Sequence, residues 1–530
     1  MLMNRQKSML ITVLTFVMIS SILLGSSSAG TAFATRPTST LTPIKHLVII
    51  FQENVSFDHY FATYPRALNE ANGSKFNASS YTPSANGLDT STALLTHNPN
   101  SANPYRLDPS QQRMCDITHS YAGEQKEYNG GLMDKFVQFS EPFFSFNPKE
   151  VGKCNPNQVM GYYDGNAVTA LWNYAQHFAM SDNFYGSIFG PSVPGHLNLI
   201  SGQTHGAIPS SNIKGVVNGT VIGNPDPVHD DCSPSFLPPS GMISMVGKNI
   251  GNILNSQNIT WGWFSAGFKP SIKTGEGKWI CAFTNHTSVG RWNSHDYYPD
   301  VEPFQYYNST ANPHHLPPTS VSMIGSTDQA NHQYDISSLW NAAMTGNLPA
   351  VSFLKAATYQ DAHPIDSDPI DEQNFLVNTI NRLQGLPDWN STAIIITYDD
   401  SGGWYDHVMP PIVNQSNDPR SDSLLGNVGL CGHAPNGTYQ DRCGYGPRLP
   451  LLIISPYSKV NFIDHTITDQ SSILRFIEDN WGLGRIGNQS FESKSGSLMN
   501  MFDFTAAAPH ADKLFLDPST GLQNSSTVIR

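Results

Sequence analysis

Residues 46 to 54 read HLVIIFQEN, and this short stretch decides the fold prediction. Leu47 to Phe51 is apolar at every position and rich in β-branched side chains. Such a run is typical of a strand buried on both faces of a parallel sheet. Glu53 and Asn54 follow at once, so a carboxylate and an amide stand where the strand is expected to end.

The rest of the chain of 530 residues repeats this pattern. Three further runs look like buried strands: 350 to 354, 393 to 397 and 451 to 454. Residues 167 to 178 and 469 to 481 have helical spacing of their apolar residues. The alternation predicts an α/β fold, and we expect one domain over residues 35 to 530 because no repeat or low-complexity linker divides it. Pro/Gly/Asn-rich stretches are expected as loops or a cap over the sheet: 63 to 112, 205 to 240 and 268 to 320.

The first 34 residues have the order of a secretory signal peptide. Arg5 and Lys7 precede an apolar stretch, and small residues lead to Ala34, after which we expect cleavage. An uncleaved anchor is the alternative, but the apolar run is short for a bilayer of about 30 Å. We therefore expect a secreted or cell-surface protein. The net charge of −13 argues against binding nucleic acid, and no motif indicates a protein partner.

Six cysteines in an exported chain predict disulfides instead of free thiols. None lies in a CxxC pair, which argues against a structural zinc site. The most local candidate bridge joins Cys431 to Cys443, and the sequence leaves the full pairing open.

A second acidic pair follows another predicted strand. Asp399 and Asp400 come directly after AIIIT, residues 393 to 397, and Tyr398. Ligands of open parallel sheets lie beyond the carboxyl ends of the strands, so these acids and Glu53 are expected to face one point. Clustered carboxylates repel one another unless a cation lies between them. With oxygen donors only, the ion should be Mg²⁺, Ca²⁺ or Mn²⁺ before Zn²⁺.

Simpler interpretations exist for each acidic segment alone. Glu53 could cap a helix that begins near Ser56. The acidic pair at 399 and 400 could start a Gly-Gly turn. A third segment, GPSVPG at residues 190 to 195, favours a site: Pro194 suits the first turn of a helix, which would place Ser192 at a helix N-terminus, where an anion is stabilised. A plain helix cap is the alternative for Ser192.

Several long motifs occur together, in this order along the chain: ENVSFDHYF, CDITHSY with GGLMDKF, DNFYGSIFGPSVPGH, YDDSGGWYDHVMPP, and the stretch from Tyr445 to Trp481. Together they resemble the secreted phosphoesterase family that contains bacterial phospholipases C and acid phosphatases. The resemblance extends from about residue 46 to about residue 504.

The resemblance implies an alkaline-phosphatase-like α/β fold, with a mostly parallel central sheet flanked by helices and long loop or cap insertions. It implies one divalent metal ion on Glu53, Asn54, Ser192, Asp399 and Asp400, with Ser192 as nucleophile. Many phospholipase C members have Thr in GPTxPN and an Asp-Glu pair. The Ser in GPSVPG and the Asp-Asp pair of this chain are more similar to the acid phosphatase branch.

Histidines suit the remaining steps, because their charge changes near neutral pH. By resemblance, His119, His363 and the pair His314 and His315 match histidines of the family's phosphate pocket, and His407 matches a family motif. As catalytic candidates we rank His119 and His363 first, then His315, His314 and His407. The predicted reaction is attack by Ser192 on phosphorus, a phosphoserine intermediate, and its hydrolysis by water. Histidines that donate protons favour activity at mildly acidic pH.

The predicted substrate is a phosphate ester, and phospholipid at a membrane surface is included. We expect an acid phosphatase-like enzyme that can also have phospholipase C activity, with a phospholipase C specific for phosphodiesters as the alternative. A serine esterase or a zinc peptidase is disfavoured because the chain has no GxSxG and no HExxH. A secreted non-catalytic protein that binds sugar or lipid through Trp261, Trp263, Trp279 and Trp292 is a further alternative, although core packing is the simpler role for tryptophans.

Overall fold

The structure is a computed structural model that describes residues 39–524, except 71–73, 109–113, 144–153, 212, 233–240, 274–278, 282–284, 290–292, 417, 419–420, 423–430, 432–441 and 506–509. The predicted signal peptide, residues 1–34, lies outside the described residues. Residues Pro37–Arg530 group into one unit.

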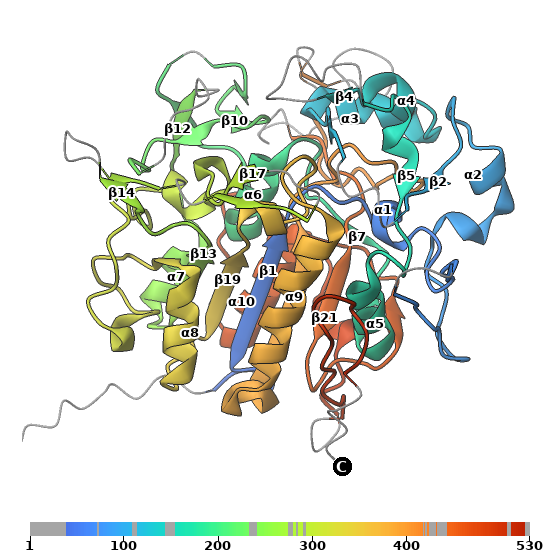
Figure 1. Ribbon diagram of the computed structural model, residues 1–530. Helices are drawn as coiled ribbons and strands as arrows, with labels where there is room; N and C mark the ends of the chain where they lie inside the picture. Colours follow the sequence, from blue (N-terminus) through green and yellow to red (C-terminus); the bar gives the residue numbers. More distant parts are fainter. Residues whose placement is uncertain are drawn as a thin grey trace, which may run out of the picture. The chain divides into compact units, whose positions relative to one another are not determined.

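An eight-stranded sheet forms the centre of this unit (Figure 1). Its strands, in spatial order, are β18 (Gln333–Asp335), β13 (Trp261–Ser265), β19 (Val351–Lys355), β1 (His46–Gln52), β20 (Thr392–Tyr398), β21 (Leu451–Ile454), β6 (Ala179–Ser181) and β22 (Phe462–Asp464). Neighbouring strands are parallel except at β21, which is antiparallel to both β20 and β6. The predicted α/β class with a mostly parallel sheet is confirmed. The run 451–454, which looked like the other strands, differs in direction because apolar composition does not encode strand orientation.

β1 lies between two parallel neighbours and is buried on both faces, as predicted. Val48 and Ile50 belong to one apolar cluster, whereas Leu47, Ile49 and Phe51 belong to another on the opposite face. This follows from the period of two in a strand, where alternate side chains point to opposite faces. A strand with apolar residues at every position therefore requires helices on both sides.

Helices cover both faces of the sheet. The cluster that contains Val48 includes residues of α5 (Thr169–His177), α8 (Ile336–Met344) and α9 (Pro369–Gln384). The other cluster includes residues of α6 (Ser192–Ser201), α7 (Ile250–Ser256) and α10 (Gln470–Trp481). The two helices predicted from apolar spacing are α5 and α10. α10 begins after Asp469, whose carboxylate accepts from the backbone N–H of Ser471 at 3.2 Å.

The Pro/Gly/Asn-rich stretches carry short elements (Figure 1). The first holds α2 (Thr92–Thr96) and β2 (Tyr105–Arg106), which pairs with β5 (Gly161–Tyr162). The second holds β8 (Ala207–Pro209), β9 (Val216–Val217), β10 (Thr220–Val221) and β11 (Asp226–Pro227), and β12 (Met242–Met245), which follows it, lies between β11 and β8 in a small sheet. The third holds β14 (Ile272–Lys273), which pairs with β15 (Trp279–Ile280), and β16 (Asn285–Thr287), which pairs with β17 (Asn293–His295). The remaining short elements are α1 (Phe57–Phe61), α3 (Tyr121–Tyr128), α4 (Phe136–Phe139), β3 (Asp116–Ile117), β4 (Pro142–Phe143), β7 (Phe184–Tyr185) and β23 (Thr468–Asp469).

Two of the tryptophans considered for ligand binding are core residues. Trp261 and Trp263 lie on β13 and are fully buried. Trp292 and the side chain of Trp279 lie outside the described part of the chain. Core packing, the simpler prediction, therefore holds for the two tryptophans that are described.

All six cysteines form disulfides, and the pairs are Cys115–Cys154, Cys232–Cys281 and Cys431–Cys443. The predicted disulfides are confirmed, and the local pair is the one that the spacing favoured. Among the residues that the structure describes, no helix has both the length and the apolar character needed to cross a bilayer.

Candidate active site

The carboxyl ends of β1 and β20 meet at one edge of the sheet. The two strands are parallel neighbours, and their last paired residues are Gln52 and Tyr398. Glu53 and Asp399 therefore leave the sheet side by side. The backbone N–H of Asn54 donates to Asp399 Oδ1 at 2.9 Å, which ties the two strand ends together.

Asn54 adopts a backbone conformation that is unusual for a residue with a side chain. Its φ is 59°, in the left-handed region that asparagine tolerates better than most residues. A Cβ at Gly402 would lie only 2.7 Å from the Asn54 carbonyl oxygen, so glycine is required there. Both polar atoms of the buried Asn54 side chain lack a hydrogen-bond partner. A buried amide without partners is costly, and a bound cation at Oδ1 would satisfy its acceptor.

The acidic residues beside Asn54 are equally undersatisfied. Glu53 Oε1 and Asp399 Oδ2 are buried and have no hydrogen-bond partner. Burial, and next the charge of Asp399, raise the pKa of Glu53 to about 8. Burial and next Asp400 raise the pKa of Asp399 to about 7. Repulsion between buried carboxylates is relieved by a cation, so these residues fit a divalent metal ion.

Ser192 lies at the first position of α6, as predicted, with Pro194 in the first turn. Its Oγ donates a hydrogen bond to Asp400 Oδ2 at 3.2 Å. The other oxygen, Asp400 Oδ1, accepts from the N–H of Gly402 at 2.6 Å, so this acid also caps the Gly-Gly turn. A Cβ at Gly195 would lie 2.1 Å from the Asp399 carbonyl oxygen. Glycine at this position lets α6 bring Ser192 against the end of β20.

The alternative of a helix cap at Glu53 does not describe the structure. Ser56 is the N-cap of α1 and accepts from the N–H of His59 at 3.2 Å. The Glu53 carboxylate instead lies 3.2 Å from Lys355 Nζ. Glu53 therefore belongs to the group at the sheet edge.

Lys355 and Asp361 complete the inner part of this group. Lys355 ends β19, and its Nζ donates to Asp361 Oδ2 at 2.6 Å. Burial lowers the pKa of Lys355, but the carboxylates of Asp361 and Glu53 outweigh it and hold the pKa above its ordinary value. The buried ammonium thus neutralises part of the negative charge of Glu53 and Asp361. Among the described residues, no lysine or arginine forms an ion pair with Asp399 or Asp400.

His196 also faces the acidic group, although sequence analysis did not select it. It lies one turn after Ser192 on α6 and is fully buried. Its Nε2 is 3.5 Å from Glu53 Oε1. Glu53, His196 and Asp399 each have a ligand atom, and these atoms all lie within 4.8 Å of one another.

Two of the five predicted histidines lie at this site. His119 Nε2 is 3.8 Å from Asp400 Oδ2, and its Nδ1 is hydrogen-bonded to the carbonyl oxygen of Ile117. Burial lowers the pKa of His119. The backbone N–H of His363 donates to Asp361 Oδ1 at 3.0 Å. Burial lowers the pKa of His363, but the carboxylates of Asp116, Asp366, Asp361 and Glu53, in decreasing order of effect, outweigh it and raise the pKa to about 10.

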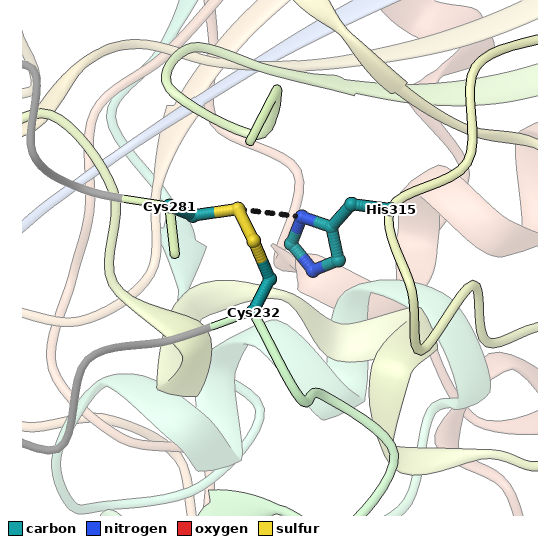
Figure 2. A group of neighbouring side chains, drawn as sticks. All are labelled: Cys232, Cys281 and His315. Carbon is teal, nitrogen blue, oxygen red and sulfur yellow. Dashed lines mark hydrogen bonds between the residues drawn. A yellow bond between two sulfur atoms is a disulfide. The ribbon is translucent and has the colours of Figure 1, made fainter. Parts of the chain in front are cut away.

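His315 is held in a separate cluster (Figure 2). Its Nδ1 lies 3.0 Å from Cys281 Sγ of the Cys232–Cys281 disulfide, and its ring stacks on Phe268 with 3.7 Å between centroids. On the other side of the ring, Nε2 is 3.1 Å from Asp230 Oδ1. Sulfurs joined to each other are not thiolate ligands, so this group is not arranged as a metal site. The contacts of His315 are those of a buried structural residue.

His314 and His407 make ion pairs away from the acidic group. The exposed His314 has its Nδ1 2.6 Å from Asp231 Oδ2. His407 Nδ1 is 2.6 Å from Asp58 Oδ2, and Arg448 lies 3.2 Å from the other oxygen of the same carboxylate. The Arg448 guanidinium is fully buried and already neutralises this acidic cluster. The five predicted histidines are thus divided between the site and other parts of the fold.

Comparison with known proteins shows to which family the chain belongs. The family model described as "Phosphoesterase family" matches residues 44–484. The chain belongs to the phosphoesterase family. The predicted family is confirmed.

Curated relatives of this phosphoesterase include phospholipases C. It is 25% identical over 468 residues to the non-hemolytic phospholipase C of Burkholderia pseudomallei, and the match covers 84% of this chain and 56% of the relative. It is 25% identical over 505 residues to phospholipase C B of Mycobacterium tuberculosis, with 90% and 81% covered. The chain therefore spans just over half the length of the first of these relatives.

Solved structures also align with the phosphoesterase. One is a protein of the alkaline phosphatase superfamily from Vibrio parahaemolyticus, at 11% identity and a TM-score of 0.28, with 75% of this chain and 74% of the other covered.

A buried carboxylate links the two loops that carry Ser192 and Asp400. Glu124, on α3 of the phosphoesterase, accepts from the N–H of Gly190 at 2.7 Å and from Ser401 Oγ at 2.6 Å. Gly190 lies two residues before Ser192, and Ser401 directly follows Asp400. One side chain therefore fixes the distance between these loops.

A hollow of about 770 Å³ adjoins the site of the phosphoesterase. One wall is the start of α3, which directly follows His119, and another includes Asn224, whose Oδ1 accepts from the N–H of Val193 at 3.1 Å. The side chains of Ile213, Val217 and Ile222 give it an apolar lining. The hollow is thus lined by the residue after His119 in the chain and by the hydrogen-bond partner of the residue after Ser192, whereas Ser192 is not among its lining residues.

The residues that sequence analysis missed had signals of two kinds. Lys355 directly follows the predicted strand at 350–354, so the rule that selected Glu53 and Asp399 also points to it. His196 lies four residues after Ser192, on the same face of a predicted helix. Glu124 had no such signal, because its partners are distant in sequence.

Proposed function

We propose that this phosphoesterase is a secreted, metal-dependent enzyme that hydrolyses phosphate esters with Ser192 as the nucleophile. The observation that carries the proposal is the hydrogen bond from Ser192 Oγ to Asp400, next to buried acidic and amide groups that lack partners. A hydroxyl at the start of a helix, beside a group that fits a cation, suits attack on an anionic ester.

Glu53, Asn54, Asp399 and Asp400 are the residues that would hold the metal ion, with the Ser192 hydroxyl directed at the same place. When bound, a divalent ion lowers the pKa of a hydroxyl and offsets negative charge on a phosphoryl group. The buried oxygens of Glu53, Asn54 and Asp399 that have no hydrogen-bond partner support this role.

The residues of the chain account for the proposed steps. Asp400 Oδ2 holds the hydrogen of the Ser192 hydroxyl, which leaves a lone pair of Oγ free to attack phosphorus. As the bond from Oγ to phosphorus forms, the hydroxyl proton passes to Asp400; the bond to the leaving alcohol breaks, its oxygen takes a proton from His119, and Ser192 becomes phosphoserine. Water then attacks phosphorus and gives a proton to His119, the bond from Oγ to phosphorus breaks, and Oγ takes the proton back from Asp400, which releases inorganic phosphate and restores the serine hydroxyl.

Two histidines would assist these steps. The high pKa of His363 keeps it cationic at neutral pH, and a cation there offsets charge on the phosphoryl oxygens. His119, 3.8 Å from Asp400, is the group we assign to donate a proton to the leaving alcohol. Because burial lowers the pKa of His119, its acid form is populated at acidic pH. This supports an acid phosphatase-like activity.

The proposed substrates are phosphomonoesters, with phospholipase C activity in addition. We infer that the hollow lined by the start of α3 and by Asn224 receives the leaving alcohol. The second candidate is a phospholipase C specific for phosphodiesters, which the names of the Burkholderia and Mycobacterium relatives favour. Three disulfides support secretion, since such bonds persist in oxidising compartments.

The test compares wild-type protein with Ser192→Ala on an aryl phosphate, a bis-aryl phosphate and phosphatidylcholine, with and without a chelator. We expect hydrolysis by the wild type, loss of turnover in Ser192→Ala with unchanged circular dichroism, and loss on chelation. Equal turnover by Ser192→Ala would refute the nucleophile. Hydrolysis of the diesters alone would favour the phospholipase C candidate, and no hydrolysis with any divalent ion would favour a non-catalytic binding protein.

A further inference from the structure

We propose that His196 is a metal ligand through Nε2, so that the site takes a borderline cation such as Zn²⁺ or Mn²⁺ in preference to Mg²⁺ or Ca²⁺. This rests on the metal site of the proposed function and adds a nitrogen donor to the predicted oxygen ligands.

The tautomer of His196 follows from one hydrogen bond. Its Nδ1 lies 3.0 Å from the carbonyl oxygen of Ser192. A carbonyl oxygen only accepts, so Nδ1 carries the hydrogen. In a neutral ring Nε2 then has a free lone pair. A histidine with one ring nitrogen bound to a backbone carbonyl and the other free is the usual arrangement of a metal ligand.

The free nitrogen is directed at the acidic group. Nε2 lies 3.5 Å from Glu53 Oε1, and neither atom has a hydrogen-bond partner. The ring is fully buried, and its edge packs against Phe51 with 4.9 Å between centroids. His196, Glu53 and Asp399 thus offer ligand atoms that all lie within 4.8 Å of one another.

The competing interpretation is an imidazolium that makes ion pairs with Glu53 and Asp399. Its Nδ1 is 3.6 Å from Asp399 Oδ2. This interpretation would place a second cation beside Lys355, whose Nζ already lies 3.2 Å from the same Glu53 oxygen. It also gives Nε2 a hydrogen that no acceptor takes up, because Nε2 has no hydrogen-bond partner.

A nitrogen ligand changes which cation fits. Imidazole suits Zn²⁺ and other first-row metals, whereas Mg²⁺ and Ca²⁺ prefer oxygen alone. The sequence-based order of Mg²⁺, Ca²⁺ or Mn²⁺ before Zn²⁺ assumed oxygen donors only. With His196 in the set, Zn²⁺ and Mn²⁺ move ahead of Mg²⁺ and Ca²⁺.

The test measures metal binding by the full chain without turnover. Metal-free wild type, His196→Ala and His196→Asp are titrated with Zn²⁺, Mn²⁺ and Mg²⁺, and the Mn²⁺ forms are examined for nitrogen coupling by pulsed electron paramagnetic resonance. His332→Ala is the matched control, since His332 is also a buried histidine whose Nδ1 is hydrogen-bonded to a backbone carbonyl, that of Trp261 at 3.0 Å.

We expect nitrogen coupling in the wild type, its loss in His196→Ala, and at least about a 10-fold loss of Zn²⁺ affinity in that variant. His332→Ala should keep both. His196→Asp supplies an oxygen donor and should shift the preference toward Mg²⁺. Absence of nitrogen coupling in the wild type, or equal Zn²⁺ affinity in the two alanine variants, would overturn the inference. The metal-binding measurement needs no turnover. An enzyme that proved inactive would therefore refute the proposed function, whereas the binding data would still decide whether His196 is a metal ligand.

Discussion

Lys355 provides a quantitative test of how charge is balanced at the site. Its Nζ lies 2.6 Å from Asp361 Oδ2 and 3.2 Å from Glu53 Oε1, and the side chain is buried. Lys355→Met keeps an unbranched apolar stem and removes the ammonium. Above pH 8, where Glu53 is ionised, two buried carboxylates then lose their cation, so the measurement is made there. Breaking a buried ion pair from one side costs about 3–5 kcal/mol, and we expect this decrease in the free energy of unfolding.

The assay is denaturant unfolding of the metal-free protein, followed by tryptophan fluorescence. Arg66→Met is the control, because Arg66 is 69% exposed in its pair with Asp89 and should contribute about 1 kcal/mol or less. The double variant Lys355→Met with Asp361→Asn removes both charges and should recover part of the lost stability. A decrease as small as that of Arg66→Met, or no recovery in the double variant, would refute the reasoning.

Three further predictions concern pH, loop positioning and the hollow. The pKa of Glu53 is raised to about 8 in the folded protein, so folding takes up a proton between pH 4.5 and pH 8. Denaturant unfolding of the metal-free protein should therefore show a free energy of unfolding that falls by up to about 5 kcal/mol as the pH rises through this range. The same pH profile in Glu53→Gln would contradict this. Glu124→Gln leaves one acceptor oxygen where the carboxylate accepts two hydrogen bonds, so kcat should fall about 10-fold with KM little changed in steady-state kinetics. Adding Ser401→Ala should cause no further fall in kcat. Additive losses would show that Glu124 does not act through Ser401. Val217→Trp fills the hollow and should lower kcat/KM about 10-fold for esters of bulky alcohols but not for esters of small ones. The control is Val460→Trp, at a valine that is 52% exposed and does not line the hollow, which should leave both values unchanged. Equal losses for both ester sizes in Val217→Trp would show that the hollow does not bind the alcohol part of the substrate.

The part of the site that could be predicted from sequence is the part that strand geometry controls. Apolar runs marked β1 and β20, and parallel strands end at the same edge of a sheet. Glu53 and Asp399 could therefore be brought together without coordinates. The antiparallel direction of β21 could not, because Leu451–Ile454 is as apolar as β1 and β20, which are parallel to each other.

The histidines show where sequence reasoning ends. A motif gives the residue type but not its tertiary partners, and His315 packs on a disulfide that closes a separation of 49 residues. The pairing of six cysteines cannot be deduced from spacing, so this contact had no sequence signal. His196 was within reach, since helical periodicity places it one turn beyond Ser192, but its approach to Glu53 depends on how α6 packs on the sheet.

The most direct test of the central claim is to trap the covalent intermediate. Wild-type protein is mixed with an aryl phosphate, quenched within the first turnovers in acid and in parallel at neutral pH, and digested for mass spectrometry. The account predicts a phosphoryl group on Ser192, absent from Ser192→Ala and from chelator-treated protein. An active enzyme that carries no phosphoryl group on Ser192, or carries it on His119 instead, would contradict the account.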